Sequence, residues 1–283
     1  MHTEEFFSNK IDKDIRIVIF SDIHYVHPGF NTKIFDTLYN EIVYAKPDYI
    51  CIPGDIVDQA SYSNLEELRD FFLNISKVAP VIVTFGNHDN GQGKAWSWYA
   101  VKNVYLREML ATIPNLHLLE DSKFKVGNIC FYGFNPSFDY YETTNESYDK
   151  LVEEISDLKV KLDENDYNVL LIHSPYQIYN YLANNPDSEL NKCDLVLSGH
   201  MHNGTLPYFF THLLNSNFKT NRSLINPVKK WFADYCQGKV YKVKDGYIHD
   251  AITKFSVSSG ILHYIDFMYR KHVTVLDIKK TDH

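Results

Sequence analysis

The 283-residue sequence contains only four cysteines, Cys51, Cys130, Cys193 and Cys236, and no two of them form a CxxC pair. This spacing argues against a disulfide framework and against a cysteine-ligated zinc site. The N-terminus has no basic stretch followed by an apolar one, and no apolar run approaches the length of a membrane span. We therefore expect a cytoplasmic protein with reduced thiols, in which Cys51 and Cys130 belong to strand-like runs of the core.

Positive charge is scarce as well. Lys and Arg together number 28 against 36 Asp and Glu, which gives a formal net charge of -8. A protein that binds a long polyanion needs clustered basic residues, so we do not expect long nucleic acid as a substrate, although a short oligonucleotide stays open. A small phosphorylated substrate is compatible with this charge because bound metal ions can supply positive charge locally.

The first two hundred residues alternate short apolar runs with stretches of helical periodicity. Strand-like runs lie at residues 15–20, 49–52, 81–85, 169–172 and 195–197, and helical stretches at 32–44, 65–78, 96–110 and 148–162. Residues 124–134 predict two short strands with a turn at Gly127-Asn128. Strands that alternate with helices predict an α/β fold with a largely parallel sheet, in which ligands bind beyond the carboxyl ends of the strands.

The last third of the chain has a different pattern. Short β elements at 240–243, 251–258 and 273–278 are expected to form a second, antiparallel sheet of the same domain. Before them, residues 206–238 contain PYFFTHLLNSNF and PVKKWFADY and are interpreted as an insertion or cap over a site. An amphipathic segment that contacts a membrane surface is the alternative interpretation of 206–238.

Five polar clusters close the predicted strands. They are Asp22-Ile23-His24, Gly54-Asp55-Ile56-Val57-Asp58, Gly86-Asn87-His88-Asp89, His173-Ser174-Pro175 and Gly199-His200-Met201-His202. Each cluster alone could be a turn, a helix cap or a solvated loop. Together, and in the place where an α/β sheet binds ligands, they predict a metal site.

The donor types in these clusters indicate which metal to expect. Carboxylate, imidazole and one amide suit manganese, with iron or zinc as alternatives, better than calcium, which prefers oxygen alone. Residues two apart on a strand point the same way, so Asp22 and His24 can share a target if extended geometry persists, as can His200 and His202. The glycines that open three of the clusters are expected to let the chain turn sharply as it leaves a strand.

The order DxH, GDxxD, GNHD, single His and GHxH resembles the calcineurin-like metallophosphoesterase superfamily over residues 22–202. The resemblance implies a four-layer α-β-β-α sandwich of two mixed β-sheets flanked by helices, here as a single domain over residues 1–283. It also implies an enzyme, a metal-dependent phosphoesterase with two divalent metal ions.

The resemblance also implies a role for each motif residue. One metal would be held by Asp22, His24, Asp55 and His202, and the other by Asp55, Asn87, His173 and His200. In this arrangement Asp55 bridges the two metals. His88 would be catalytic and would protonate the leaving group, with Asp58 orienting it.

The substrate is less constrained by the sequence. Gln59 stands where protein Ser/Thr phosphatases of the superfamily have Arg, which argues against a phosphoprotein. The paired His200 and His202 resemble the phosphodiesterase and small-molecule branches of the superfamily. We therefore expect a phosphodiesterase or pyrophosphatase that acts on a small molecule such as a nucleotide or nucleotide-sugar, and a phosphomonoesterase stays open as the alternative. Lys94, Trp96 and Trp98 could contact such a substrate or could belong to a helix, while His27 and Asn90 are expected to be solvated loop residues.

Two alternatives from other classes stay open. One is a hydrolase of a lipid-linked phosphate, peripheral at the inner membrane face, for which 206–238 would be the contact. The other is a non-catalytic metal-binding scaffold, which the intact catalytic motifs disfavour. The sequence sets neither the oligomeric state nor the native metal.

Overall fold

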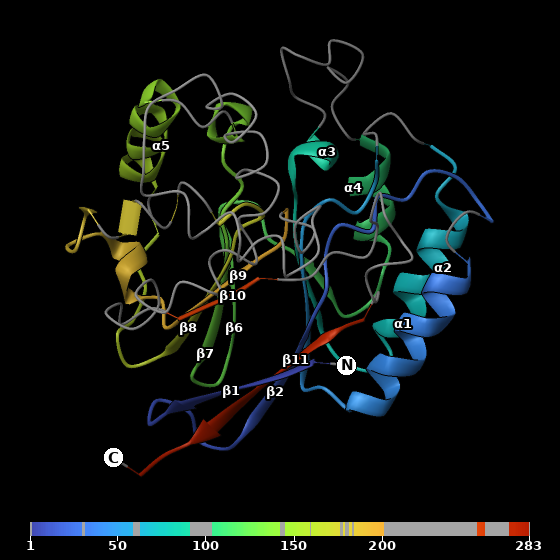
Figure 1. Ribbon diagram of the computed structural model, residues 1–283, viewed down its shortest axis with the longest axis horizontal. Helices are drawn as coiled ribbons and strands as arrows, with labels where there is room; N and C mark the ends of the chain where they lie inside the picture. The colour runs from blue at the N-terminus through green and yellow to red at the C-terminus, as the bar shows by residue number, and fades with distance from the viewer. Residues whose placement is uncertain are drawn as a thin grey trace, which may run out of the picture.

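The computed structural model describes residues 2–29, 32–58, 63–90, 104–141, 145–158, 160–175, 178, 181–182, 184–200, 254–257 and 272–282. Two β-sheets lie at the centre of this part of the chain, and helices lie on the outer side of each sheet (Figure 1). The predicted four-layer α/β sandwich of two mixed sheets is therefore confirmed.

The first sheet has six strands in the order β1-β11-β2-β3-β4-β5. Their bounds are β1 His2–Ser8, β2 Ile15–Ile19, β3 Tyr49–Pro53, β4 Val81–Thr84, β5 Leu116–Leu118 and β11 Thr274–Lys280. Strands β2 to β5 run parallel, and β11 is antiparallel to β2 and parallel to β1.

The second sheet has five strands in the order β10-β9-β8-β7-β6. Their bounds are β6 Ser122–Val126, β7 Ile129–Gly133, β8 Tyr167–Leu171, β9 Leu195–Ser198 and β10 Lys254–Val257. Strands β7 to β10 are parallel, and β6 forms the predicted hairpin with β7 around Gly127, whose φ is +59°.

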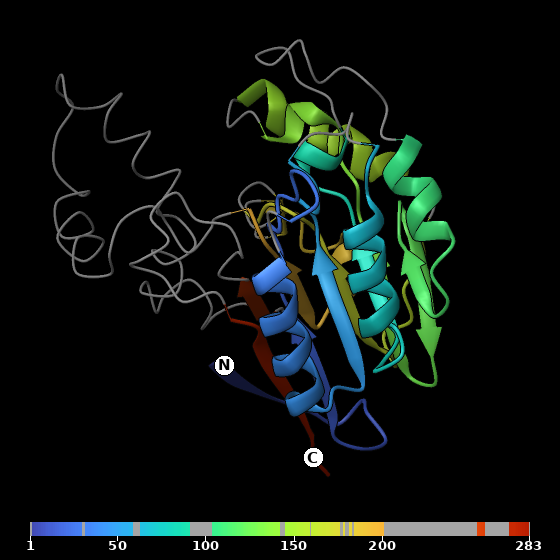
Figure 2. The ribbon, with the colours of Figure 1, turned by 90° about the vertical axis from the view of Figure 1, so that its right-hand side faces the viewer.

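Helices cover the outer face of each sheet. The bounds are α1 Thr32–Ala45, α2 Glu66–Ile75, α3 Asn87–Asn90, α4 Val104–Ala111 and α5 Asn145–Asp157, with 3-10 turns at Phe138–Tyr141 and Glu189–Lys192. Figure 2 looks onto α1 and α2 in front of the first sheet, and α5 lies on the side of the second. In the described part of the chain, no helix combines the length and the apolar character that crossing a membrane requires.

The strands read as continuous apolar runs because both faces of each sheet are buried. In β2, Ile17 and Ile19 enter the core between the two sheets, whereas Val18 packs toward α1 and α2. In the second sheet Leu171 enters the core between the sheets and Leu170 packs toward α5. This double burial explains why period-two alternation is absent from these strands.

The cysteines that the sequence places in strands are core residues. Cys51 is 0% exposed and Cys130 is 2% exposed. The helix predicted at 96–110 is present from Val104, and residues 91–103 lie outside the described residues. The interpretations of 206–238 and of a strand at 240–243 also fall outside them.

The prediction of a separate antiparallel sheet in the last third is wrong. Strand β10 pairs in parallel with β9 at the edge of the second sheet, and β11 lies inside the first sheet between β1 and β2. A strand pattern specifies which residues face a core but not which strand they pair with, because pairing is decided by contacts distant in sequence. Leu276 and Ile278 of β11 fill the core between the sheets beside Ile15 and Ile17.

Candidate metal centre

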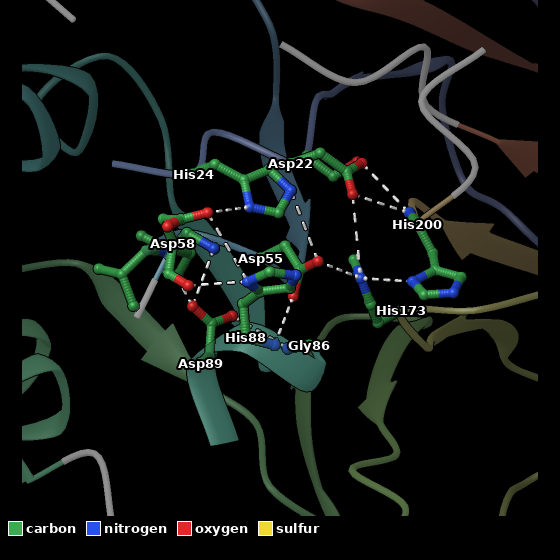
Figure 3. A network of polar contacts seen from close by, with 12 residues as sticks. Asp22, His24, Asp55, Asp58, Gly86, His88, Asp89, His173 and His200 are labelled. Atoms are coloured by element: carbon green, nitrogen blue, oxygen red, sulfur yellow. Dashed lines mark hydrogen bonds and ion pairs between the residues drawn. The ribbon is translucent and has the colours of Figure 1, made fainter. Parts of the chain in front are cut away.

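The predicted ligand loops converge at the carboxyl ends of five strands. Asp22 follows β2, Asp55 follows β3 and Gly86 follows β4 in the first sheet, while His173 follows β8 and Gly199 follows β9 in the second. Figure 3 shows these loops bringing their side chains toward Asp55. The site therefore lies where the carboxyl edges of both sheets meet, as expected for an α/β fold.

The backbone at the site is left-handed rather than extended. The φ angles are 56° at Asp22, 45° at His24, 53° at Asp55 and 67° at His200. Extended geometry therefore does not bring Asp22 and His24 together. Their loop instead lies along the next one, since the amides of Asp22 and His24 donate to the carbonyls of Gly54 and Asp55 at 3.1 Å each. Non-glycine residues in this conformation cost about 1 kcal/mol or more each, and they are concentrated at functional sites.

The glycines of the motifs allow close approach more than sharp turns. Gly54 has a φ of +85°, and a Cβ there would lie 2.6 Å from the amide nitrogen of Gly86 and 2.7 Å from Nδ1 of His173. Gly86 and Gly199 do not have φ in the left-handed region. At Gly199 a Cβ would lie 2.8 Å from Oδ2 of Asp22, so that loops of the two sheets are in contact there.

Two groups of potential metal ligands share Asp55. Asp22, His24 and Asp55 form one group, and Asp55, His173 and His200 form the other, with the ligand atoms of each group within 4.8 Å of one another. Oδ2 of Asp55 lies 3.6 Å from Nε2 of His24 and 2.9 Å from Nε2 of His173. A single buried carboxylate thus faces a histidine of each group.

The second group has features that suit a cation. Nδ1 of His173 donates to the carbonyl oxygen of Pro53 at 2.7 Å, which directs Nε2 toward Asp55. Nδ1 of His200 lies 3.3 Å from that Nε2, so two imidazole nitrogens point at one another. The buried Oδ1 of Asn87 finds no hydrogen-bond partner among the described residues. Acceptor atoms that converge in this way fit a divalent metal.

The electrostatics of the group also suit a cation. Burial lowers the pKa of His173, but the charge of Asp55, the hydrogen bond to it and the charge of Asp22 outweigh burial and raise the pKa to about 9. Burial raises the pKa of Asp55, yet the charge of His173 and the other histidines holds it well below its usual range. A proton on His173 thus balances the charge of Asp55, and metal binding at His173 would release that proton.

Asp58 contacts two histidines. Its main-chain carbonyl lies 2.7 Å from Nδ1 of His88, whereas its carboxylate lies 3.8 Å from that nitrogen and 3.5 Å from Nδ1 of His24. The rings of His24 and His88 meet edge to face at 4.6 Å. The carbonyl of Asp58 is therefore the closer partner of His88, and its carboxylate is the closer partner of His24.

The sequence motifs assign no role to Asp89 or to Tyr141. Asp89 is fully buried, and burial together with the charge of Asp55 raises its pKa to about 6. The ring of Tyr141 lies 6.0 Å from that of His173 and 5.4 Å from that of His200. Asp89 could have been selected from the sequence because it belongs to the GNHD motif. Tyr141 lies on a 3-10 turn that carries no motif, so no sequence pattern points to it.

The remaining residues selected from the sequence have three outcomes. His202, Gln59 and the stretch with Lys94, Trp96 and Trp98 lie outside the described residues. His27 is exposed, as predicted. Asn90 is half-buried and donates from Nδ2 to Oδ1 of Asn135 at 2.7 Å, so it is not a solvated loop residue.

The chain belongs to the calcineurin-like phosphoesterase family, whose sequence model it matches over residues 15–204. The matched residues include all five polar clusters. An uncharacterized metallophosphoesterase of Helicobacter pylori is 26% identical over 201 residues, which cover 70% of this chain and 47% of the relative. One of Campylobacter jejuni is 25% identical, covering 74% of this chain and 50% of the relative.

A further relative is an SbcCD nuclease subunit of Staphylococcus epidermidis. It is 25% identical, and the match covers 71% of this chain and 56% of the relative. The chain thus spans about half the length of the curated relatives it matches.

Proposed function

We propose that the protein binds two divalent metal ions and hydrolyses a phosphodiester or pyrophosphate bond in a small molecule such as a nucleotide or nucleotide-sugar. The observation that carries the proposal is the presence of two ligand groups that share Asp55. Two ions held in one site could share Asp55, because its carboxylate faces His24 of one group and His173 of the other.

The residues fit two metals in the following way. Asp22, His24 and Asp55 would hold one ion together with His202, and Asp55, Asn87, His173 and His200 would hold the other. Manganese is the first choice, with iron or zinc as alternatives, because the donors mix oxygen and nitrogen. When bound, such ions supply positive charge opposite phosphate oxygens and lower the pKa of water.

His88 is the proposed proton donor. A carbonyl oxygen can only accept, so Nδ1 of His88 carries the hydrogen that Asp58 receives at 2.7 Å. This hydrogen bond fixes the ring and leaves Nε2 to protonate the departing oxygen. The side chain of His88 is 35% exposed, which a residue that meets a substrate requires.

The charge of the chain supports a small substrate. With a net charge of -8, a long polyanion would be repelled outside the metal centre. A short single strand is the second candidate, favoured by the similarity to the nuclease subunit of S. epidermidis. Hydrolysis of a lipid-linked phosphate at the inner membrane face is a third, and its test is co-sedimentation with anionic liposomes.

The test is hydrolysis of bis-p-nitrophenyl phosphate by the manganese-loaded protein. We expect metal-dependent turnover with this probe, whose leaving group departs as a stable anion. With a diester whose leaving group is an alkoxide, we expect a fall of roughly 100-fold or more in His88→Asn, since that group needs a proton from a general acid. His117→Asn is the matched control, because His117 stacks on Phe124 at the edge of the first sheet, away from the site. Its rate should equal that of the wild type.

Turnover is then compared among a nucleotide-sugar, p-nitrophenyl phosphate and a short oligonucleotide, to distinguish the proposed substrate classes. Faster turnover of a nucleotide-sugar than of p-nitrophenyl phosphate or a short oligonucleotide supports the proposal. Manganese binding without turnover of any of them would instead indicate a non-catalytic scaffold.

A further inference from the structure

Asp89 is a fully buried carboxylate that accepts hydrogen bonds from two different loops. Its Oδ1 accepts from the backbone amides of Ile56 at 2.9 Å and Val57 at 3.0 Å, and its Oδ2 accepts from the amide of Gly86 at 2.9 Å. Figure 3 shows Asp89 beneath Asp55, on the side away from His200. Both oxygens are used as acceptors.

The donors belong to the segments that carry two metal-ligand candidates. Ile56 and Val57 directly follow Asp55, and Gly86 directly precedes Asn87. The contact is reciprocal, because Oδ1 of Asp55 accepts from the amide of His88 at 3.0 Å. Each aspartate therefore binds the backbone of the segment that carries the other.

This exchange also stabilises a strained conformation. Asp55 has a φ of 53°, which a non-glycine residue keeps only when its surroundings fix it. The amides of the next two residues are held by Asp89. Without an acceptor there, the loop after β3 could relax toward an ordinary conformation and carry the Asp55 carboxylate with it.

We propose that Asp89 is a positioning residue that fixes Asp55 relative to Asn87 and thereby sets the affinity of the site for divalent metal. This inference rests on the proposed function, in which both of those residues are ligands. Asp89 does not contact the metals in this arrangement and acts only through the backbone it binds.

Asp89→Asn is the informative substitution because it preserves size. Three amide hydrogens need acceptors, and asparagine offers one oxygen and one NH₂ group. At one end of the side chain, two N–H groups would therefore face each other. Loss of such a supporting hydrogen bond lowers metal affinity about 10- to 100-fold in known metal sites.

The experiment is a calorimetric titration of the metal-free protein with Mn²⁺. We expect Asp89→Asn to bind at least one ion about 10- to 100-fold more weakly than the wild type. Amide hydrogen exchange should also be faster at Ile56, Val57 and Gly86 in the variant. Asp166→Asn is the matched control, since Asp166 is 7% exposed, precedes β8 at the opposite end of the sheet and pairs with Lys125 at 2.6 Å. It should retain wild-type affinity.

Unchanged Mn²⁺ affinity in a folded Asp89→Asn protein would overturn the proposal, even if its melting temperature fell, because the role would then be structural only. An equal loss of affinity in Asp166→Asn would also overturn it. Asp89→Ser replaces Asp89→Asn if the latter does not fold, with the same expectation. Absence of turnover in the wild type contradicts the proposed function but leaves the affinity comparison intact, whereas absence of Mn²⁺ binding contradicts both.

Discussion

The backbone conformation of Gly54 and its lack of a side chain are central to the geometry of the candidate metal centre. Its φ of +85° is accessible to glycine at little cost, and its missing side chain lets the loops after β3, β4 and β8 come together. The residues around it, including Asp55 with a φ of 53°, keep a costly conformation. The backbone conformation that brings the ligand side chains together therefore lowers the local stability of these loops.

Gly54→Ala should be strongly destabilising for this reason. A Cβ would lie 2.6 Å from the backbone of Gly86 and 2.7 Å from His173, so both strain and overlap contribute, and we expect a loss of roughly 3 kcal/mol in the free energy of unfolding. Urea unfolding measures this loss. Gly127→Ala is the control, because Gly127 has a φ of +59° and an added methyl group there would meet nothing within 4 Å. It should cost only about 1 kcal/mol, and equal losses at both positions would contradict the argument.

At the residue scale, the sequence predicts which residues are ligand candidates better than it predicts their backbone conformation. Five motifs are enough to select Asp55, His173 and His200 as ligand candidates. The left-handed conformation of Asp55 is not readable from them, because it depends on amide donors and carboxylates that arrive from other loops. The same holds for Tyr141, whose contact with His200 is a product of tertiary packing.

At the scale of elements, β11 joins the end of the chain to its beginning. Asp277 on β11 pairs with Arg16 on β2, with Oδ1 2.7 Å from Nε and Oδ2 2.9 Å from Nη2. The hydrogen bond and charge of Arg16 lower the pKa of Asp277 below its ordinary value. This ion pair stabilises the pairing of β11 with β2, although the two strands lie more than two hundred residues apart in sequence.

The pair predicts a pH dependence of stability with a definite sign. Because the pKa of Asp277 is lower in the folded state, its contribution is complete above the unfolded-state value of about 4 and is lost as the pH falls through the lower, folded-state value. Asp277→Asn should therefore cost about 1 kcal/mol of folding stability at pH 7 and less at pH 3. The value at pH 7 is set this low because Arg16 is partly exposed and solvent screens its charge.

Urea unfolding of both proteins at the two pH values measures the difference. Asp14→Asn removes an exposed partner of Lys279 and serves as the control, for which a smaller effect is expected. A difference between the wild type and Asp277→Asn that grows toward pH 3 would show that the assigned sign is wrong.

Elements with strong local patterns can be predicted, and those defined by distant partners cannot. The apolar runs of β2, β3, β4, β8 and β9 stand out because both of their faces are buried. Strand β1 is not predicted because HTEEFFS is largely polar, and among the described residues β11 is the strand that pairs with it. The sheet to which β11 belongs is not predictable either, since its partner β2 lies at the other end of the chain.

At the scale of the whole molecule, the candidate metal centre connects the two sheets. Asp22 and Asp55 extend from the first sheet, and His173 and His200 from the second. Oδ2 of Asp55 and Nε2 of His173 lie 2.9 Å apart across the two sheets. A metal held by these residues would bind both sheets at once and only in the folded state, so its binding energy would add to global stability.

Removal of metal should therefore lower the melting temperature of the whole protein. At a free Mn²⁺ concentration of about 100 times Kd, one ion adds about 2.7 kcal/mol, which corresponds to roughly 5 °C or more for a chain of this size. Differential scanning calorimetry with Mn²⁺ and with chelator measures the shift. His88→Asn should keep the full shift because His88 is assigned to proton transfer, whereas Asp55→Asn should lose most of it because Asp55 is shared by both ligand groups. A full shift in Asp55→Asn would place the metal elsewhere and contradict the assigned centre.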